Sequence, residues 1–459
     1  MSVRALMAKV TRQLGRFGHA KAGNVAITFA MATLPIIGGV GAAVDYSRAN
    51  AVKASLQTAL DSTALMLSKE ATTDTSSALQ TNATKYFKAL YTPSNTNDIT
   101  ISASYTTTGG SQVTVNGSVD VPTVFMGIMG FQKITVNGSS TSAWGSTRLR
   151  VALVLDNTGS MSDDGKMTAL KSATKSLLTQ LKAAAGTNGD VYVSIIPFSK
   201  DVNVGSSNYN ASWIDWDDWE AANGSWQYTT TCSGGSSRHG HSHCSGAYTW
   251  QAANHSTWNG CVTDREKTQV PHTTYDYDQS AENPDPSTPD SLFPAEQYDG
   301  CPVAMMGLNY DWTTMTSLVN SMQPNGNTNQ PIGLVWGWQS LVGGGPLVAP
   351  LTSSDYTYQK IIILLSDGLN TEDRWYSAQT PVDNRMYQTG NGSGTCANIK
   401  AAGITIYSIQ VNTGGDPTST LLKNCASSTD KFWELKTSSA IAATFQQIGT
   451  NLTQLRVAK

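Results

Sequence analysis

The sequence predicts an α/β protein in which an N-terminal transmembrane helix and a small α+β region precede a doubly wound, mostly parallel sheet with a disulfide-rich insertion. Three observations carry this prediction. An uncharged apolar run of 20 residues, 25–44, lies near the N-terminus. From residue 148 onward, short apolar runs alternate with segments of helical period. A stretch of different composition, 201–310, interrupts that alternation and holds four of the six cysteines.

The composition limits the class of protein. Charged residues make up 14% of the 459 residues and the net charge is −3, whereas a typical soluble domain has roughly 25% charged residues. A chain so nearly neutral is not a basic nucleic-acid-binding protein, so nucleic acid is not expected as a partner. The hydrophobic fraction of 39% excludes a polytopic membrane protein. At this length we expect two or more folded units.

The N-terminus predicts one membrane span. Residues 1–22 contain five Lys or Arg and no Asp or Glu, which predicts a basic cytoplasmic segment. A helix of the 20 residues 25–44 is about 30 Å long, one hydrocarbon core. A cleaved signal peptide is the alternative, but its apolar run is usually about 7–15 residues. Everything from Asp45 onward is therefore expected outside the cytoplasm.

The helix is expected to continue beyond the membrane. Apolar residues such as Val52, Leu56 and Leu60 keep helical spacing, so 23–70 is predicted to be one helix with an extracytoplasmic extension. Residues 71–147 are expected to form a small α+β region, because 98–143 alternate like short strands.

The α/β domain is expected over 148–455. Buried strands are predicted at 150–156, 191–198, 360–367 and 404–411. Helices are predicted at 167–184, 311–322, 331–342, 395–402, 418–425 and 438–455. Apolar strands alternating with helices predict a mostly parallel sheet, with ligands at the carboxyl ends of the strands.

The interrupting stretch 201–310 is interpreted as an insertion into that domain. It has 14 acidic and 3 basic residues and holds six of the twelve tryptophans. The Trp-rich segment 213–226 is either a recognition surface or the small core of the insertion. Its acidic residues Asp276, Asp278, Asp285 and Asp290 lack EF-hand spacing and are expected to form an ordinary acidic surface.

The six cysteines all follow the predicted membrane span, which favours three disulfides in an oxidising compartment. Cys396 and Cys425 flank predicted helices and could join adjacent elements. The other four, Cys232, Cys244, Cys261 and Cys301, allow three pairings that the sequence leaves open. A zinc cluster is disfavoured because no C-x-x-C pair is present.

Oxygen-bearing side chains gather where predicted strands end. Asp156, Thr158 and Ser160 alternate directly after a buried strand, Thr328 lies in the loop before a helix, and Asp367 ends the strongest strand. Two carboxylates and three hydroxyls form an all-oxygen set suited to Mg²⁺ or Mn²⁺. No nucleophile or general base stands at a recognisable spacing, so the site is expected to bind rather than catalyse.

These residues resemble the metal-ion-dependent adhesion site (MIDAS) of von Willebrand factor type A (vWA) domains. Asp156-x-Thr158-x-Ser160 is similar to the D-x-S-x-S element, with Thr158 keeping the hydroxyl of the first Ser, and Thr328 and Asp367 follow in the expected order. The resemblance covers about 148–200 and 303–455. It implies a Rossmann-like vWA domain that holds Mg²⁺ on all five residues.

The N-terminal part carries a second resemblance. Residues 16–50 (RFGHAKAGNVAITFAMATLPIIGGVGAAVDYSRAN) and 121–144 are similar to TadE/TadG-type proteins of Tad (Flp) pilus systems. The shared features are the basic flank, the Gly-Asn before the apolar run and the Asp-Tyr with a following Arg after it. The resemblance implies a single-pass inner-membrane protein of a bacterium that acts in pilus assembly or surface attachment.

Together these features predict a non-enzymatic extracytoplasmic protein that binds a pilin, another assembly component or a surface ligand through Mg²⁺. Three alternatives stay open at this point. The chain could be an adhesin that contacts external surfaces through the insertion. It could be a metal-dependent hydrolase in which Mg²⁺ activates water, or a structural pseudopilin whose long helix packs into a filament.

Overall fold

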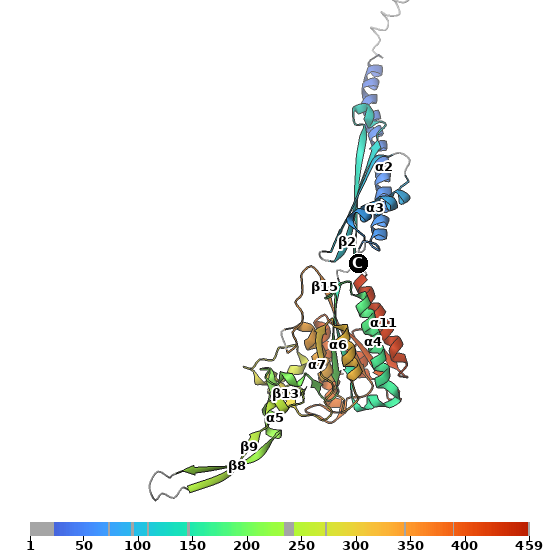
Figure 1. The fold of residues 1–459 in the computed structure, drawn as a ribbon. Coiled ribbons are helices and arrows are strands. Elements are labelled where there is room, and N and C mark those ends of the chain that lie inside the picture. Colours follow the sequence, from blue (N-terminus) through green and yellow to red (C-terminus); the bar gives the residue numbers. More distant parts are fainter. Residues whose placement is uncertain are drawn as a thin grey trace, which may run out of the picture. The chain divides into compact units, whose positions relative to one another are not determined.

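The computed structural model describes residues 23–71, 74–92, 96–107, 110–144, 147–233, 243–270, 273–343, 346–388 and 390–457. The predicted basic segment 1–22 lies outside these ranges. The chain divides into two compact units, Met1–Trp144 and Gly145–Lys459 (Figure 1).

The first unit packs two helices on a three-stranded antiparallel sheet of order β1-β2-β3. Its elements are α2 (Gly23–Leu67), α3 (Ser76–Leu90), β1 (Asn97–Thr106), β2 (Ser111–Pro122), the short 3₁₀ helix η1 (Met126–Met129) and β3 (Lys133–Trp144). The alternating sequence predicted these strands, and the structure contains them.

Two parts of α2 differ in their surroundings. The C-terminal part is amphipathic, and Leu56, Leu60 and Leu67 are fully buried with Phe87 of α3 in the core of this unit. The N-terminal part instead exposes its large apolar side chains, as Phe29 is 71% exposed. Within the described residues, α2 holds one stretch, Phe29–Leu67, that is long and apolar enough to cross a membrane.

The second unit is built on a large mixed sheet. Its central strands are β4 (Thr147–Asp156), β5 (Val191–Phe198), β14 (Met306–Asn309), β15 (Thr357–Ser366), β16 (Thr405–Val411) and β17 (Phe432–Leu435). They lie in the order β14-β5-β4-β15-β16-β17, and only β14 is antiparallel to its neighbour. Numbered along the chain, these six strands follow the doubly wound order 3-2-1-4-5-6. The predicted α/β fold class is therefore confirmed.

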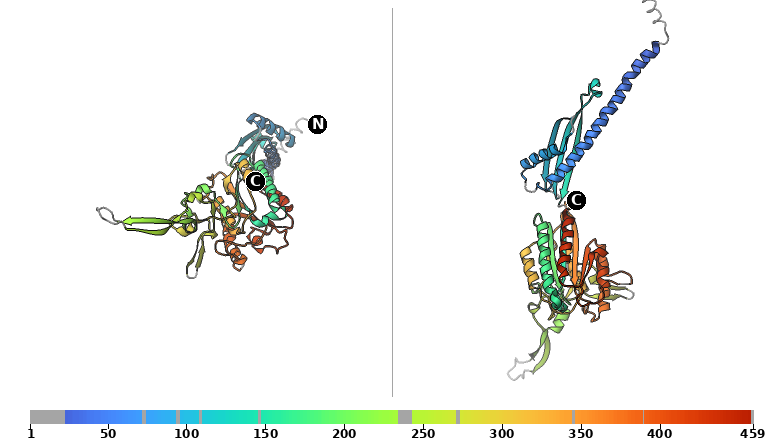
Figure 2. Two further views of the ribbon diagram at one scale, coloured as in Figure 1. Left: turned by 60° about the horizontal axis from the view of Figure 1, so that its bottom comes forward. Right: turned by 90° about the vertical axis from the view of Figure 1, so that its right-hand side faces the viewer.

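Helices cover both faces of this sheet (Figures 1 and 2). Alternate residues of β4 explain this: Leu153 and its like-facing neighbours pack with one group of helices, and Val154 packs with another. The first group is α4 (Lys166–Ala184), α6 (Trp312–Ser321) and α11 (Ala440–Val457). The second includes α7 (Gln330–Val342), α8 (Gln379–Met386), α9 (Thr395–Ala401) and α10 (Thr420–Cys425).

Residues between β5 and β14 extend the sheet and then leave it. The short strands β6 (Val202–Asn203), β10 (Cys261–Val262), β13 (Phe293–Glu296) and β7 (Ile214–Asp215) continue it beyond β5 in that order. The helix α5 (Asp217–Ala222) and two separate hairpins complete this region. The hairpins are β8 (Gly224–Ser233) with β9 (His243–Ala252), and β11 (Lys267–Val270) with β12 (Thr273–Asp276).

The Trp-rich segment 213–226 lies partly in the core and partly on the surface. Trp219 is 2% exposed in the core of the unit, and Trp213 and Trp216 pack partly buried against that core. Trp226, by contrast, is 64% exposed on β8. The segment therefore begins as core and ends as surface.

The expectation of an ordinary acidic surface was wrong for Asp276 and Asp278, although Asp285 is exposed as expected. Arg385 of α8 donates to Asp276 through Nε at 2.9 Å and to Asp278 through Nη2 at 3.0 Å. Its Nη1 also pairs with Asp264 at 2.7 Å. A buried carboxylate is retained when it is paired and hydrogen-bonded, so these acids attach the insertion to the α/β core.

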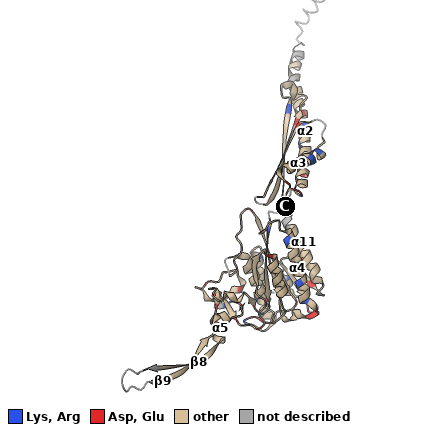
Figure 3. Cartoon of the chain, in the orientation of Figure 1, with Lys and Arg blue, Asp and Glu red and all other residues tan. Residues whose placement is uncertain are grey.

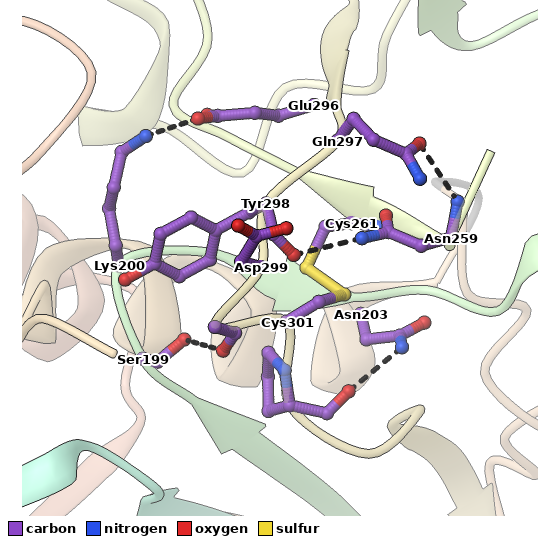
Figure 4. The surroundings of a disulfide bond; sticks show 12 residues. Ser199, Lys200, Asn203, Asn259, Cys261, Glu296, Gln297, Tyr298, Asp299 and Cys301 are labelled. Carbon is purple, nitrogen blue, oxygen red and sulfur yellow. Dashed lines mark hydrogen bonds and ion pairs between the residues drawn. A yellow bond between two sulfur atoms is a disulfide. The ribbon is translucent and has the colours of Figure 1, made fainter. Parts of the chain in front are cut away.

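Disulfides join neighbouring elements of the second unit. Cys261 of β10 bonds to Cys301, and hydrogen bonds from Ser199 to Gly300 and from Asn203 to Pro302 surround this bridge (Figure 4). Cys396 of α9 bonds to Cys425 of α10, as the sequence suggested. Cys244 is also disulfide-bonded, and the β8–β9 register places it opposite Cys232.

Replacing Cys396 and Cys425 together by Ala should destabilise the second unit. The bridge closes a loop with a sequence separation of 29, and restricting such a loop in the unfolded chain contributes about 3.6 kcal/mol. Chemical unfolding followed by Trp fluorescence measures this, because eleven of the twelve tryptophans lie in 145–459. An unchanged unfolding midpoint would contradict the prediction.

Candidate metal-binding site

Three loops meet at the carboxyl ends of β4 and β15. The first begins at Asp156, the last residue of β4, and carries Thr158 and Ser160. The second precedes α7, and its Gly326 carbonyl accepts a hydrogen bond from the Gly159 N–H at 2.9 Å. The third follows β15 and begins with Asp367. Parallel strands end at the same edge of a sheet, so neighbouring strands bring these distant segments together.

Asp156 lies at the bottom of the site and is fully buried. Its Oδ1 accepts the Thr158 N–H at 2.8 Å, and its Oδ2 accepts the Ser366 hydroxyl at 2.6 Å. Burial, together with the nearby Asp367 carboxylate, raises the pKa of Asp156 to about 7. A cation bound at this site would therefore favour the ionised form of Asp156.

The hydroxyls of the first loop connect to Asp367. Ser160 Oγ donates to Asp367 Oδ1 at 2.7 Å, and Thr158 Oγ1 lies 3.1 Å from Ser160 Oγ. Thr158 is 1% exposed and Asp367 4%. Hydrogen bonds thus connect four of the five predicted residues. Ser160 bonds to Asp367 and to Thr158, and the Thr158 N–H bonds to Asp156.

Thr328 takes part through its loop. It is 4% exposed, and its N–H donates to Thr371 Oγ1 at 2.8 Å while its carbonyl accepts the Thr371 N–H at 2.9 Å. These bonds hold the second loop to the third, just as the Gly159–Gly326 bond holds it to the first. The fifth predicted residue therefore lies in a segment that borders the site.

A lysine that the sequence analysis did not include completes the charges of the site. Lys166 Nζ donates to Asp367 Oδ2 at 2.7 Å and to the Ser160 carbonyl at 3.2 Å, and the side chain is 8% exposed. It is the first residue of α4, where the helix dipole disfavours a cation. A lysine at this unfavourable position is the feature of the sequence that could have indicated its role in the site. Ser366 was also missed, although it directly precedes Asp367.

The donor set fits a hard divalent cation. Carboxylate and hydroxyl oxygens from Asp156, Thr158, Ser160 and Asp367 lie together, and these are the ligands that Mg²⁺ and Mn²⁺ prefer. Among the described residues, no group of three or more His, Cys, Asp or Glu is placed to hold a metal. A site here would therefore depend on its hydroxyls.

Comparisons with solved structures return weak similarities. The pilus adhesin SpaC of Lactobacillus rhamnosus GG has a TM-score of 0.35 at 14% identity, over 78% of this chain and 34% of that one. The vWF domain of the pilus tip protein Mfa5 of Porphyromonas gingivalis has 0.35 at 10% identity, over 69% and 98%. The mussel byssus protein PTMP1, in a structure with a zinc-occupied MIDAS motif, has 0.31 at 12% identity, over 66% and 47%. This chain thus spans about a third of SpaC, and such scores are too low to show a shared fold.

The sequence comparison is more specific. No protein with a curated description matches this chain. Residues 23–66 match the Tad family, described as Flp pilus-assembly TadE/G-like. They include most of α2, the helix with the candidate membrane span. The predicted resemblance to TadE/TadG-type proteins is therefore confirmed, and it is carried by this N-terminal segment, which precedes a doubly wound α/β domain.

Proposed function

We propose that this protein is a membrane-anchored component of a Tad (Flp) pilus assembly or surface-attachment system that binds a partner protein through a Mg²⁺-dependent site. The proposal rests above all on the meeting of Asp156, Thr158, Ser160 and Asp367 at one edge of the sheet. The Tad family match of residues 23–66 supports the pilus-related setting.

In this proposal, Asp156, Thr158, Ser160, Thr328 and Asp367 hold Mg²⁺ or Mn²⁺. When bound, the metal offers a coordination position that a carboxylate of the partner can fill. Asp156 supplies buried negative charge, and the Thr158 and Ser160 hydroxyls leave the cation short of negative charge. Lys166 orients Asp367 through its ion pair. The partner is a pilin, another assembly component or a surface ligand that carries an acidic group.

We propose a binding role and not an enzymatic one. The side chains around Asp156 and Asp367 are hydroxyls and a lysine that already pairs with Asp367. Hydrolysis would need a base positioned to activate water. Assaying the purified chain with Mg²⁺ for phosphatase and protease activity tests this directly, and turnover that disappears in Asp156→Asn would contradict the binding role.

The proposed location follows from α2. A single span with residues 1–22 in the cytoplasm would place the second unit in the periplasm or on the cell surface of a bacterium. Disulfides at Cys261–Cys301 and Cys396–Cys425 agree with an oxidising compartment.

An adhesin that contacts external surfaces is the second candidate, and the β8–β9 hairpin favours it. Trp226, Tyr228 and Tyr248 are 60–67% exposed, and the register pairs Tyr228 with Tyr248 and Trp226 with Trp250. The described strands of this hairpin carry no Lys, Arg, Asp or Glu (Figure 3). Exposed aromatic side chains are common anchors in recognition. Attachment that survives Ser160→Ala but is lost in Trp226→Ser/Tyr248→Ser would favour this candidate.

Replacing Ser160 by Ala tests the main proposal in cells. The change removes the hydroxyl that bonds Asp367, so pili in electron micrographs and surface attachment should be lost while protein in the membrane fraction is maintained. Ser162→Ala is the matched control, because Ser162 is exposed in the same loop. Pili and attachment at normal levels in both variants would contradict a role for the site.

A further inference from the structure

The segment between β2 and β3 is an uncharged loop with exposed apolar side chains. Residues 123–132 read TVFMGIMGFQ. Ile128 is 83% exposed, Phe131 61%, Val124 58% and Met129 51%. We call residues 124–131 the apolar loop. A cluster of exposed apolar side chains of this kind marks contact with a partner or a membrane.

The backbone of this loop is held in a defined shape. The buried Asp45 carboxylate of α2 accepts the N–H groups of Val124, Phe125 and Met126, at 2.8 Å for the last two. At the other end, the Phe131 N–H donates to the Met126 carbonyl at 3.0 Å. The exposed apolar side chains are therefore presented by a fixed backbone, because its polar groups are already bonded within the protein.

The loop lies along the apolar part of α2. A Cβ at Gly41 would come within 2.4 Å of Phe125 Cβ, and a Cβ at Gly38 would lie 3.5 Å from Met129 Sδ. Gly41 thus makes room for Phe125, while Met129 lies within ordinary contact distance of position 38. Gly38 to Asp45 corresponds to about 10 Å of helix. The loop therefore reaches well into the run 25–44 that predicts the membrane span.

The gap between helix and loop is apolar as well. An open groove of about 320 Å³ is lined by Ile36, Ile37, Val40, Gly41, Val44 and Phe125. An apolar groove offers water no hydrogen-bond partners and suits a hydrocarbon chain. Ile36 and Val40 remain more than 60% exposed, so the apolar surface of α2 continues into that of the loop.

Charged side chains begin where the apolar surface stops. Arg48, one turn beyond Asp45, is 37% exposed and lies 3.8 Å from the Asp45 carboxylate, and Lys133, two residues after the loop, is 59% exposed and pairs with Asp120. Cations at such a boundary are attracted to lipid phosphates. The sequence of apolar surface followed by basic side chains is the pattern of a protein surface seated in the membrane interface.

We propose that the apolar loop inserts into the extracytoplasmic leaflet beside α2, with lipid acyl chains as its partner. The span and the loop would then form a two-part anchor, and Asp45 would hold the two parts together. This inference rests on the membrane anchorage within the proposed function and is independent of the Mg²⁺ site.

Site-specific fluorescence in vesicles tests the insertion. The full chain is reconstituted in phosphatidylcholine–phosphatidylglycerol vesicles with the environment-sensitive probe NBD attached at Ile128→Cys or Phe131→Cys. Both side chains are exposed, so the label disturbs no core. Ile37→Cys reports on the span, and Ala89→Cys, exposed on α3, is the matched control outside it. Quenching by doxyl-labelled lipid is compared with quenching by aqueous iodide.

The probes at 128, 131 and 37 should lose fluorescence to the doxyl lipid and be protected from iodide, and the probe at 89 should behave in the opposite way. If 37 is lipid-quenched while 128 and 131 respond to iodide, the insertion is overturned and the span remains. If iodide also quenches the probe at position 37, the membrane anchorage by α2 is overturned together with the insertion. Protection of 128 and 131 from both quenchers would mean that protein covers the loop, which also overturns the proposal.

Discussion

Asp156→Asn should abolish Mg²⁺ binding and remove a large part of the pH dependence of stability of the metal-free second unit. The pKa of Asp156 is raised to about 7 by burial and then by Asp367. In the unfolded chain the group ionises near its ordinary value of 3.8. Between these values the folded state holds a proton that the unfolded state has lost, so stability falls as pH rises from about 4 to about 7.

For wild type this contribution amounts to about 4 kcal/mol. Asn cannot ionise, so the free energy of unfolding of the variant in EDTA should lack that decline. Saturating Mg²⁺ should stabilise wild type and leave the variant unchanged. Asp163→Asn, an exposed change in the same loop, is the control and should behave as wild type. Equal pH slopes in wild type and Asp156→Asn would refute this account of the carboxylate pair.

Lys166→Met should destabilise the metal-free protein by about 3–5 kcal/mol, because it leaves the buried Asp367 carboxylate without its cation. The lysine side chain is 8% exposed and that of Asp367 is fully buried, with 2.7 Å between Nζ and Oδ2. Met retains most of the aliphatic stem and removes the ammonium group together with its hydrogen bonds to Asp367 and the Ser160 carbonyl. The loss of stability therefore reports mainly the ion pair and these hydrogen bonds.

Mg²⁺ should restore much of the stability of Lys166→Met, because a bound divalent cation neutralises the same carboxylates. Unfolding curves with EDTA and with Mg²⁺ measure the difference. Lys182→Met, at an exposed position of the same helix, should change little in either condition. A variant as stable as wild type in EDTA would contradict the assigned role of Lys166. A loss that Mg²⁺ does not reduce would place the metal elsewhere.

The regular elements could be predicted because their apolar periods are strong. The strand of β15 is a run of buried Ile and Leu between polar residues, and α4 and α11 place apolar residues at helical spacing on one face. The approach of four of the five candidate site residues to one another could be predicted for the same reason. These residues follow directly from strands whose ends could be located, and neighbouring strands in a doubly wound sheet bring those ends together.

Three features could not be predicted, because they depend on contacts between distant segments that no strand end marks. Asp276 looks like a surface acid because its partner Arg385 lies 109 residues further along the chain. The insertion strands β6, β7 and β10 span only two residues each, too short to show a period. Lys166 reaches Asp367 across 201 residues. In each case tertiary pairing, and not local pattern, determines the burial of the group.

Titration of the purified full chain with Mn²⁺, followed by electron paramagnetic resonance, tests the central claim most directly. Mn²⁺ prefers the same oxygen ligands as Mg²⁺, and its free signal falls when the ion binds. We expect one saturable Mn²⁺ site per chain, from which Mg²⁺ displaces the bound Mn²⁺. This binding should be lost in Asp156→Asn and kept in Asp163→Asn. An absence of saturable binding by wild type, or binding that persists in Asp156→Asn, would contradict it.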